Sequence, residues 1–154
     1  MNKLKIYIAG FDVFSEKAFE ISKENKEICN RYGFIGLSPI DNVCDKVEDI
    51  FIGNIGLIDE ADVVVANLNN FRGLTIDDGT AFEIGYAYAK EKIIYGYMDD
   101  TRSMRDKIGI KDKEGFNVED FNRPINLMIS ESTHIVEGSF EDCIKSLKKI
   151  QIKE

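Results

Sequence analysis

The sequence is poor in the residues that build disulfide frameworks and metal sites. Its 154 residues include three cysteines, one histidine and no tryptophan. Cys29, Cys44 and Cys143 lie far apart and are odd in number, which argues against a disulfide-stapled secreted domain and favours a reducing cytoplasm. His134 has no cysteine or second histidine at ligand spacing, so neither a zinc site nor any other metal site is expected.

The chain also lacks an excess of positive charge and long apolar runs. Lys and Arg number 20 against 28 Asp and Glu, and the resulting net charge of −8 repels phosphate backbones and anionic lipids. The first apolar stretch is broken by Gly10 and Asp12, too early for a signal sequence. We therefore expect no nucleic-acid polymer and no membrane as a partner, and no targeting segment.

Two phosphate-binding motifs are missing as well. No Gly-x-Gly-x-x-Gly follows the first β-rich run, and no Gly-x-x-x-x-Gly-Lys-Ser/Thr occurs anywhere in the chain. Both motifs depend on glycine-rich turns that let backbone amides approach a phosphate, so neither a dinucleotide site nor a P-loop is supported.

What is present fits one globular domain over residues 1–154, because 44% hydrophobic residues and this length suffice for one core. Apolar and β-rich runs predict strands at residues 4–9, 34–37, 63–66, 93–97 and 134–136. Helical spacing predicts helices over 15–33 (with Ser15 as N-cap), 45–60, 79–90 and 140–150, and a short helix beginning at Pro124. The alternation predicts an α/β fold with a doubly wound, five-stranded parallel sheet and helices on both faces.

Residues 98–122 show neither helical nor strand periodicity and are dense in charge. So long a connection is often functional, which suggests a lid, with Arg102 as a base contact or an intersubunit ion pair. A solvated, charged surface loop explains the same pattern.

Polar residues gather where an open parallel sheet binds its ligands, beyond the carboxyl ends of the strands. Loops 10–14 and 67–79 follow the first and third predicted strands, and the second loop runs into a helix that carries Glu83. Thr80-x-x-Glu83 matches a capping box, in which Glu83 has a structural role. The alternative is a carboxylate in the first turn, held ionised by the helix dipole and able to act as a nucleophile. Asp77 is either a solvated turn residue or the second carboxyl of a glycosidic cleavage with retention.

Tyr7 and Asn54 admit two interpretations each. Tyr7 lies in the first predicted strand, as a core residue with a satisfied hydroxyl or as the group that orients Glu83. Asn54 lies on an apolar helix stripe, where a buried amide costs about 1–3 kcal/mol without a partner. Its partner is either the backbone or a ligand.

Several motifs occur in a fixed order over most of the chain. They are Ile6-Tyr7-Ile8-Ala9-Gly10, Ala61-Asp62-Val63-Val64-Val65-Ala66-Asn67, Phe71-Arg72-Gly73, Asp78-Gly79-Thr80-Ala81-Phe82-Glu83-Ile84-Gly85-Tyr86-Ala87 and Pro124-Ile125-Asn126-Leu127-Met128. Together they resemble the nucleoside 2-deoxyribosyltransferases. The resemblance implies a flavodoxin-like fold and the exchange of a purine or pyrimidine base on 2′-deoxyribonucleosides in nucleoside salvage.

The resemblance also implies a role for individual residues. The family's nucleophilic glutamate, which forms a covalent 2-deoxyribosyl-enzyme, corresponds to Glu83. The family's acid/base aspartate corresponds to Asp77, and the tyrosine that hydrogen-bonds the nucleophile corresponds to Tyr7. Asn126 and Met128 match residues that complete a neighbouring subunit's sugar site, which implies a homo-oligomer built from dimers, up to a hexamer.

Further substrate contacts are expected at four positions around the site. They are Gly10, Phe14, Asn54 and Gly79. The sequence departs from the family at Phe11, where a proline is common, and at Asn54, where some members have an aspartate. The implied partners are small 2′-deoxyribonucleosides and free nucleobases, and no cofactor is expected.

Two other functions fit the same residues. A related 2′-deoxynucleoside 5′-phosphate N-hydrolase would use water in place of the acceptor base and would prefer a 5′-phosphate. A non-catalytic nucleoside- or flavin-binding module would use the same crevice without turnover.

Overall fold

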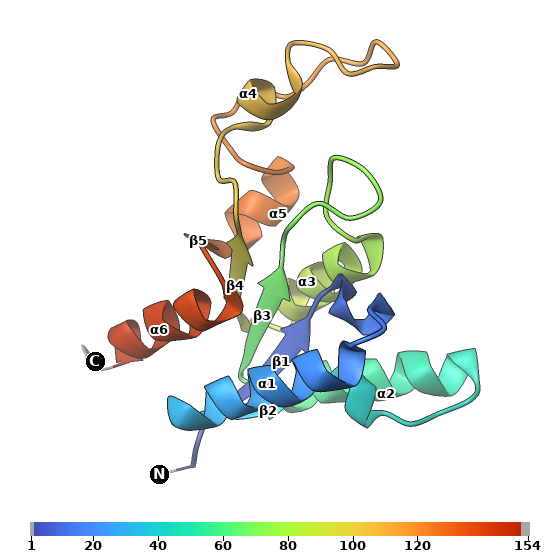
Figure 1. Ribbon diagram of the computed structural model, residues 1–154, viewed down its shortest axis with the longest axis vertical. Helices are drawn as coiled ribbons and strands as arrows, with labels where there is room; N and C mark the ends of the chain where they lie inside the picture. Colours follow the sequence, from blue (N-terminus) through green and yellow to red (C-terminus); the bar gives the residue numbers. More distant parts are fainter. Residues whose placement is uncertain (1, 152–154) are drawn as a thin grey trace.

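The computed structural model describes residues 2–151 and contains one sheet of five parallel strands in the order β2-β1-β3-β4-β5 (Figure 1). The strands are β1 (Lys5–Ala9), β2 (Ile35–Leu37), β3 (Val63–Asn67), β4 (Ile93–Met98) and β5 (His134–Glu137). This order is that of flavodoxin-like doubly wound folds, whose ligands bind where the strand order reverses, here between β1 and β3. The predicted fold class is confirmed, and all five strands lie where the sequence pattern predicts them.

Within residues 2–151 the chain forms six α-helices and two short 3₁₀ helices, all but α4 placed around the sheet (Figure 1). They are α1 (Ala18–Arg31), α2 (Val47–Glu60), α3 (Asp78–Ala89), α4 (Met104–Ile108), α5 (Leu127–Ser132), α6 (Phe140–Gln151), η1 (Phe11–Phe14) and η2 (Pro39–Asp41). Among the described residues, no helix combines the length and apolar character needed to cross a bilayer.

Two apolar cores lie on opposite faces of the sheet because successive strand residues point to opposite sides. On one face Ile6 and Val65 pack with Cys143 of α6 and with residues of α1. On the other face Tyr7 and Val64 pack with residues of α2 and α3. All five residues of β3 are buried, as expected of a central parallel strand covered on both sides.

Local details differ from the sequence prediction at three helix starts. Ser15 does not cap α1, because the N-cap is Lys17 and the Ser15 hydroxyl accepts a hydrogen bond from the Lys17 amide. The short helix after Pro124 begins at Leu127, with Asn126 as its N-cap. The third start, that of α3, belongs to the site described below. Polar side chains near a helix start bond either to the helix or to the turn before it, and the pattern alone does not separate the two.

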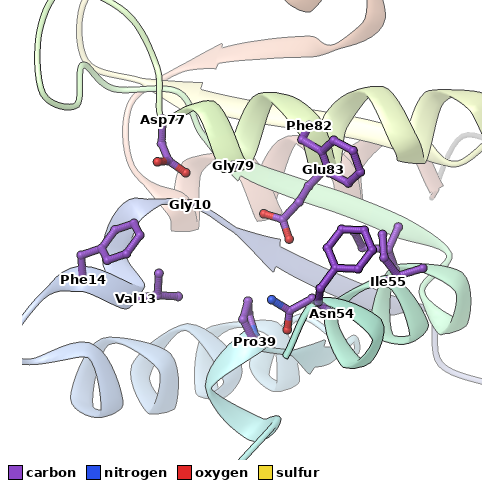
Figure 2. A pocket seen from close by; sticks show the side chains of 12 residues that line it. Gly10, Val13, Phe14, Pro39, Asn54, Ile55, Asp77, Gly79, Phe82 and Glu83 are labelled. Atoms are coloured by element: carbon purple, nitrogen blue, oxygen red, sulfur yellow. The ribbon is translucent and has the colours of Figure 1, made fainter. Parts of the chain in front are cut away.

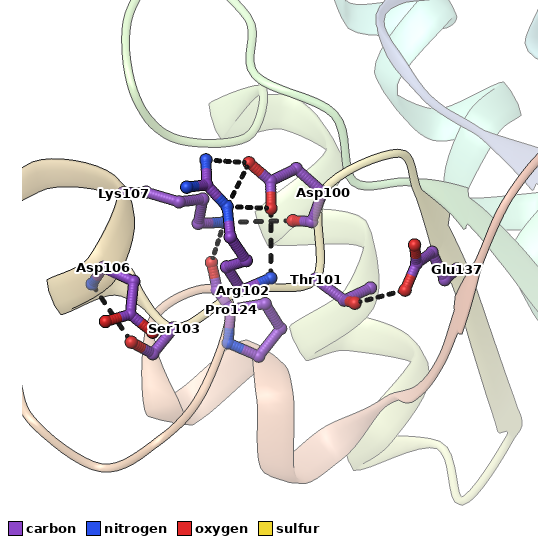
Figure 3. A network of polar contacts seen from close by, with 8 residues as sticks. All are labelled: Asp100, Thr101, Arg102, Ser103, Asp106, Lys107, Pro124 and Glu137. Carbon is purple, nitrogen blue, oxygen red and sulfur yellow. Dashed lines mark hydrogen bonds and ion pairs between the residues drawn. The ribbon is translucent and has the colours of Figure 1, made fainter.

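Residues 99–124 form an arm that leaves the carboxyl end of β4 and includes α4 (Figure 1). Within it Asp100 binds the Arg102 guanidinium through both carboxylate oxygens, at 2.7 to 3.2 Å (Figure 3). Arg102 is thus engaged by a neighbour two residues away. The amide of Met104 donates to the carbonyl of Arg123 at 2.8 Å, which joins the two ends of the arm.

Candidate active site

A cavity of about 220 Å³ lies at the carboxyl ends of β1 and β3, the position that the strand order predicts (Figure 2). Twelve residues line it. They are Gly10, Val13, Phe14, Pro39, Phe51, Asn54, Ile55, Ile58, Asp77, Gly79, Phe82 and Glu83. Six of the nine residues predicted for the site, Gly10, Phe14, Asn54, Asp77, Gly79 and Glu83, are among them. Tyr7 contacts the site through its hydrogen bond to Glu83, whereas Asn126 and Met128 do not line the cavity.

Asp77 is the N-cap of α3, so the predicted capping box of Thr80 and Glu83 is wrong. The Asp77 carboxylate accepts hydrogen bonds from the Thr80 amide at 2.9 Å and the Thr80 hydroxyl at 2.8 Å. Asp77 is buried, in contrast to the solvated turn residue that its sequence context allowed. Gly79 belongs to the same turn, where an added Cβ would lie 3.3 Å from an Asp77 carboxylate oxygen. The helix start therefore holds one carboxyl group in a fixed position at the cavity.

Glu83 lies one turn further into the helix, as the sixth residue of α3. Its carboxylate accepts a hydrogen bond from the hydroxyl of Tyr7, which is fully buried in β1. Both interpretations of Tyr7 are therefore correct: it is a core residue, and its hydroxyl holds Glu83. The contact joins residues 76 positions apart in the sequence and fixes the carboxylate toward the cavity (Figure 2).

The environment of Glu83 favours its protonated form. Burial raises the pKa of the Glu83 carboxyl to about 7; the hydrogen bond from Tyr7 opposes this shift, and the nearby charge of Asp77 adds to it. Burial and the facing Glu83 carboxylate also raise the pKa of Tyr7 well above its usual value, so that its hydroxyl remains a donor. The expected place of Glu83 in the first turn is wrong: it is the sixth residue of α3, beyond the turn where the helix dipole acts most strongly, and burial opposes its ionised form.

Asn54 supplies a third polar group to the cavity, from α2 (Figure 2). Its side-chain oxygen is buried and accepts no hydrogen bond from any residue that the structure describes. An unsatisfied buried acceptor costs about 1–3 kcal/mol. A ligand with a hydroxyl or N–H group at this position would remove that cost.

Apolar side chains form two walls of the cavity, one on each side of Glu83. Phe14 and Val13 of η1 form one wall, on the side of Asp77 (Figure 2). Phe51 and Phe82 form the other, with ring centroids 5.9 Å apart. Flat apolar surfaces of this kind suit a planar or ring-shaped ligand.

Asn126 and Met128 lie at α5, outside the cavity of their own chain. The Asn126 side chain accepts a hydrogen bond from the Met128 amide at 3.0 Å, and the Met128 side chain is 72% exposed. Met128 lines a separate groove between α3 and α5 with apolar residues such as Leu127 and Tyr88. No residue of segment 98–122 is among the twelve that line the cavity.

No group of three or more histidine, cysteine or carboxylate side chains within residues 2–151 is arranged to hold a metal ion. The polar side chains that line the cavity are the carboxyl groups of Asp77 and Glu83 and the amide of Asn54. This arrangement can support acid/base and nucleophilic chemistry, with one carboxyl ionised and the other protonated.

Comparison with known proteins decides the family. The model of the nucleoside 2-deoxyribosyltransferase family matches residues 6–128, which include Tyr7, Asp77 and Glu83. The chain belongs to this family. The match ends at Met128, so that β5 and α6 lie outside it.

Individual proteins and solved structures are similar to this chain. A 2-deoxyribosyltransferase from Leishmania mexicana superposes with a TM-score of 0.87 at 35% identity, over 96% of this chain and 98% of that one. A 2-deoxyribosyltransferase from Bacillus psychrosaccharolyticus shares the fold, with a TM-score of 0.60 at 21% identity, over 94% of this chain and 90% of that one. An uncharacterised protein of Schizosaccharomyces pombe is 33% identical over 114 residues, which are 67% of this chain and 54% of that protein. This chain thus matches about half the length of its curated relative.

Several residues of the cavity were missed by the sequence analysis. Val13, Pro39, Phe51, Ile55, Ile58 and Phe82 line it. Their apolar character is also that of core residues, so the sequence held no signal that separates the two roles. In the structure, Phe51 and Phe82 differ from core residues because their side chains are 55% and 53% exposed.

Proposed function

We propose that this protein is a nucleoside 2-deoxyribosyltransferase that exchanges the base of a 2′-deoxyribonucleoside through a covalent intermediate on Glu83. The observation that carries the proposal is the presence of two carboxyl groups, Asp77 and Glu83, at one cavity. The hydroxyl of Tyr7 donates a hydrogen bond to Glu83. Membership of the family supports the same chemistry.

In the first half-reaction an oxygen of the Glu83 carboxylate attacks C1′ of the sugar. The C1′–N bond breaks, its electron pair goes to the departing base, and the base nitrogen takes a proton from Asp77. In this step Glu83 acts as the ionised nucleophile and Asp77 as the proton donor. With the pKa of Glu83 raised to about 7, about half of the Glu83 carboxyl groups are ionised at neutral pH and able to attack.

In the second half-reaction a new base attacks C1′ from the face that the first base left. Its nitrogen loses a proton to Asp77, the bond between C1′ and Glu83 breaks, and the carboxylate is restored. The Tyr7 hydroxyl donates to Glu83 throughout, which stabilises the carboxylate as attacking group and as leaving group. The acceptor oxygen of Asn54 is available to a hydroxyl or N–H group of the substrate.

The residues that line the cavity include no lysine, arginine or histidine, which supports an uncharged nucleoside over a 5′-phosphate. Two arms of one assay distinguish the functions. Deoxyinosine with adenine should yield deoxyadenosine, whereas release of hypoxanthine without adenine, faster with deoxyinosine 5′-phosphate, would indicate the hydrolase. Binding of nucleosides or of flavin without either product would indicate the non-catalytic module.

Glu83→Ala is the decisive variant, because it removes the nucleophile and leaves Asp77 in place. Base exchange should fall at least 1,000-fold, about 4 kcal/mol in activation free energy. Exchange at the rate of the unchanged protein would contradict the covalent mechanism. Mass spectrometry of the protein mixed with deoxyinosine should show an added 2-deoxyribosyl group that Glu83→Ala lacks.

We further propose that a second copy of this chain brings Asn126 and Met128 to the cavity. Support comes from the exposure of Met128 and from the apolar groove between α3 and α5, about 410 Å³ in volume. Light scattering should then give a mass of at least two chains. In mixtures of Glu83→Ala and Asn126→Ala chains, hybrid dimers should recover part of the activity that both variants lack; no recovery would contradict a shared site.

The three cysteines support the expected reducing cytoplasm. Cys29, Cys44 and Cys143 are all free thiols, and burial raises the pKa values of Cys29 and Cys143 to about 12. Thiols that are neutral and buried need no oxidising compartment for stability.

A further inference from the structure

An aromatic cluster behind the Phe14 wall of the cavity joins two loops that are far apart in the sequence. We name it the aromatic clamp, consisting of Phe11, Phe14, Phe71 and Arg72. The Phe71 ring is nearly parallel to both other rings, with centroids 4.9 Å from Phe11 and 5.5 Å from Phe14. Phe11 and Phe14 belong to η1, after β1, and Phe71 belongs to the loop after β3.

Arg72 covers the same rings with its guanidinium group. The guanidinium carbon lies 4.6 Å from the centroid of Phe71 and 5.1 Å from that of Phe14, within range of a cation–π interaction. Arg72 has a φ of 52°, a left-handed conformation that costs about 1–2 kcal/mol for a residue with a side chain. Strain of this kind persists only where the surroundings enforce it, so the loop fixes the Arg72 backbone from which the guanidinium reaches the rings.

Hydrogen bonds also join the same two loops. The side-chain nitrogen of Asn67 donates to the Asp12 carboxylate at 3.1 Å. The side-chain oxygen of Asn67 accepts a hydrogen bond from the side-chain nitrogen of Asn69 at 2.9 Å. Asn69 in turn accepts from the amide of Asp99 after β4 at 2.9 Å. These hydrogen bonds therefore connect the segments that follow three neighbouring strands, β1, β3 and β4, and the clamp residues belong to two of those segments.

The clamp has one member in the cavity and three outside it. Phe14 lines the cavity and is 60% exposed, whereas Phe11, Phe71 and Arg72 are not among the lining residues. A side chain so exposed samples several rotamers unless its neighbours select one. Stacking on Phe71 and the contact with Arg72 select the ring position that the cavity presents.

We propose that Phe71 and Arg72 determine base selectivity by positioning the Phe14 ring as the wall against which the nucleobase lies. This inference rests on the proposed function, since Phe14 stands on the side of Asp77 (Figure 2), the group that would protonate the base. Phe71 and Arg72 are positioning residues that act through Phe14. Neither residue lines the cavity to which Glu83 contributes its carboxyl group.

The test compares Phe71→Leu, Phe71→Tyr and Arg72→Gln with Phe19→Leu, a control on α1 that is 74% exposed and lies outside the cavity. Phe71→Leu keeps an apolar side chain and removes the stacked ring, whereas Phe71→Tyr keeps the ring. We expect Phe71→Leu to raise KM for the acceptor base at least fivefold and change kcat less than twofold. The ratio of kcat/KM for adenine to that for thymine should change at least threefold, with Arg72→Gln in the same direction and Phe71→Tyr and Phe19→Leu unchanged.

The outcomes separate the clamp from the proposed function. Calorimetric binding of hypoxanthine, adenine and thymine is measured independently of turnover. If the unchanged protein binds bases but exchanges none, the proposed function fails, and a fivefold weaker binding by Phe71→Leu still supports the clamp. The clamp would be overturned, with the proposed function intact, if folded Phe71→Leu and Arg72→Gln still exchange bases with the same KM, base affinity and adenine-to-thymine ratio as the unchanged protein. A fall in kcat alone would overturn it too, because that result assigns the residues to the chemical step.

Discussion

Replacing Glu83 with glutamine should stabilise the folded protein at neutral and alkaline pH and leave it unchanged at acidic pH. The reason is the pKa of the carboxyl group, which burial raises from 4.5 to about 7 in the folded chain. Each unit of difference in pKa between folded and unfolded chains corresponds to about 1.4 kcal/mol. The ionised carboxylate therefore costs about 3 kcal/mol of folding free energy, which glutamine, always neutral, does not incur.

The pH range of the effect follows from the two pKa values. Below pH 4.5 the carboxyl is protonated in both states, so the variant and the unchanged protein should be equally stable. Between pH 4.5 and about 7 the unfolded chain loses this proton while the folded chain keeps it, and the stability due to Glu83 falls as the pH rises. Above about pH 7 the difference should reach its full value.

Urea unfolding at intervals from pH 4.5 to 8 would measure the difference, with Glu20→Gln on the exposed face of α1 as a matched control. The control removes the same charge from solvent instead of from a partly buried site. A difference that does not grow with pH, or a variant less stable than the unchanged protein at pH 8, would refute the reasoning. That outcome would mean that the hydrogen bond from Tyr7 outweighs desolvation.

Three further substitutions test other features of the site. Tyr7→Phe removes the hydrogen bond that favours ionised Glu83, so the acidic limb of the pH profile of kcat/KM should move upward by about one pH unit; an unmoved limb would contradict this role. Asp77→Asn keeps an N-cap acceptor for Thr80 but cannot donate a proton to the base. The free energy of urea unfolding should change by less than about 0.5 kcal/mol, while base exchange falls about 100-fold or more. Full exchange would exclude Asp77 as the acid. Gly10→Ala places a Cβ 2.8 Å from a neighbouring side-chain carbon at a φ of 155°, so thermal unfolding should show a loss of about 1–3 kcal/mol, and an unchanged melting temperature would argue against close packing there.

The sequence pattern predicts the sheet because burial on two faces leaves a simple signature. The run Val63-Val64-Val65-Ala66 is apolar without alternation, and it lies at the centre of the sheet. The pattern is less reliable for α4, because five residues of helix in a charged segment produce too few turns for a period to appear.

At the site, the residue types were predictable, but their environments were not. Thr80 and Glu83 have the spacing of a capping box, yet Asp77 takes the cap because its carboxylate reaches two donors of Thr80. Glu83 is thereby left free to bond Tyr7 across 76 residues of sequence. A local pattern cannot reveal that a competing cap exists or that a distant strand supplies a partner. For the same reason the stacking of Phe71 on η1 was not predicted.

The arm of residues 99–124 has a consequence for how this chain tolerates changes in length. Its ends are joined by the Met104–Arg123 hydrogen bond, and a bridge between Lys111 and Asn117 closes its tip. Met104 and Val118 are buried, but they belong to neither core of the sheet. Residues added or removed at the tip, between 112 and 116, therefore leave the spacing of β4 and α5 unchanged. The arm is a place where new segments can be accommodated without moving the carboxyl groups of the cavity.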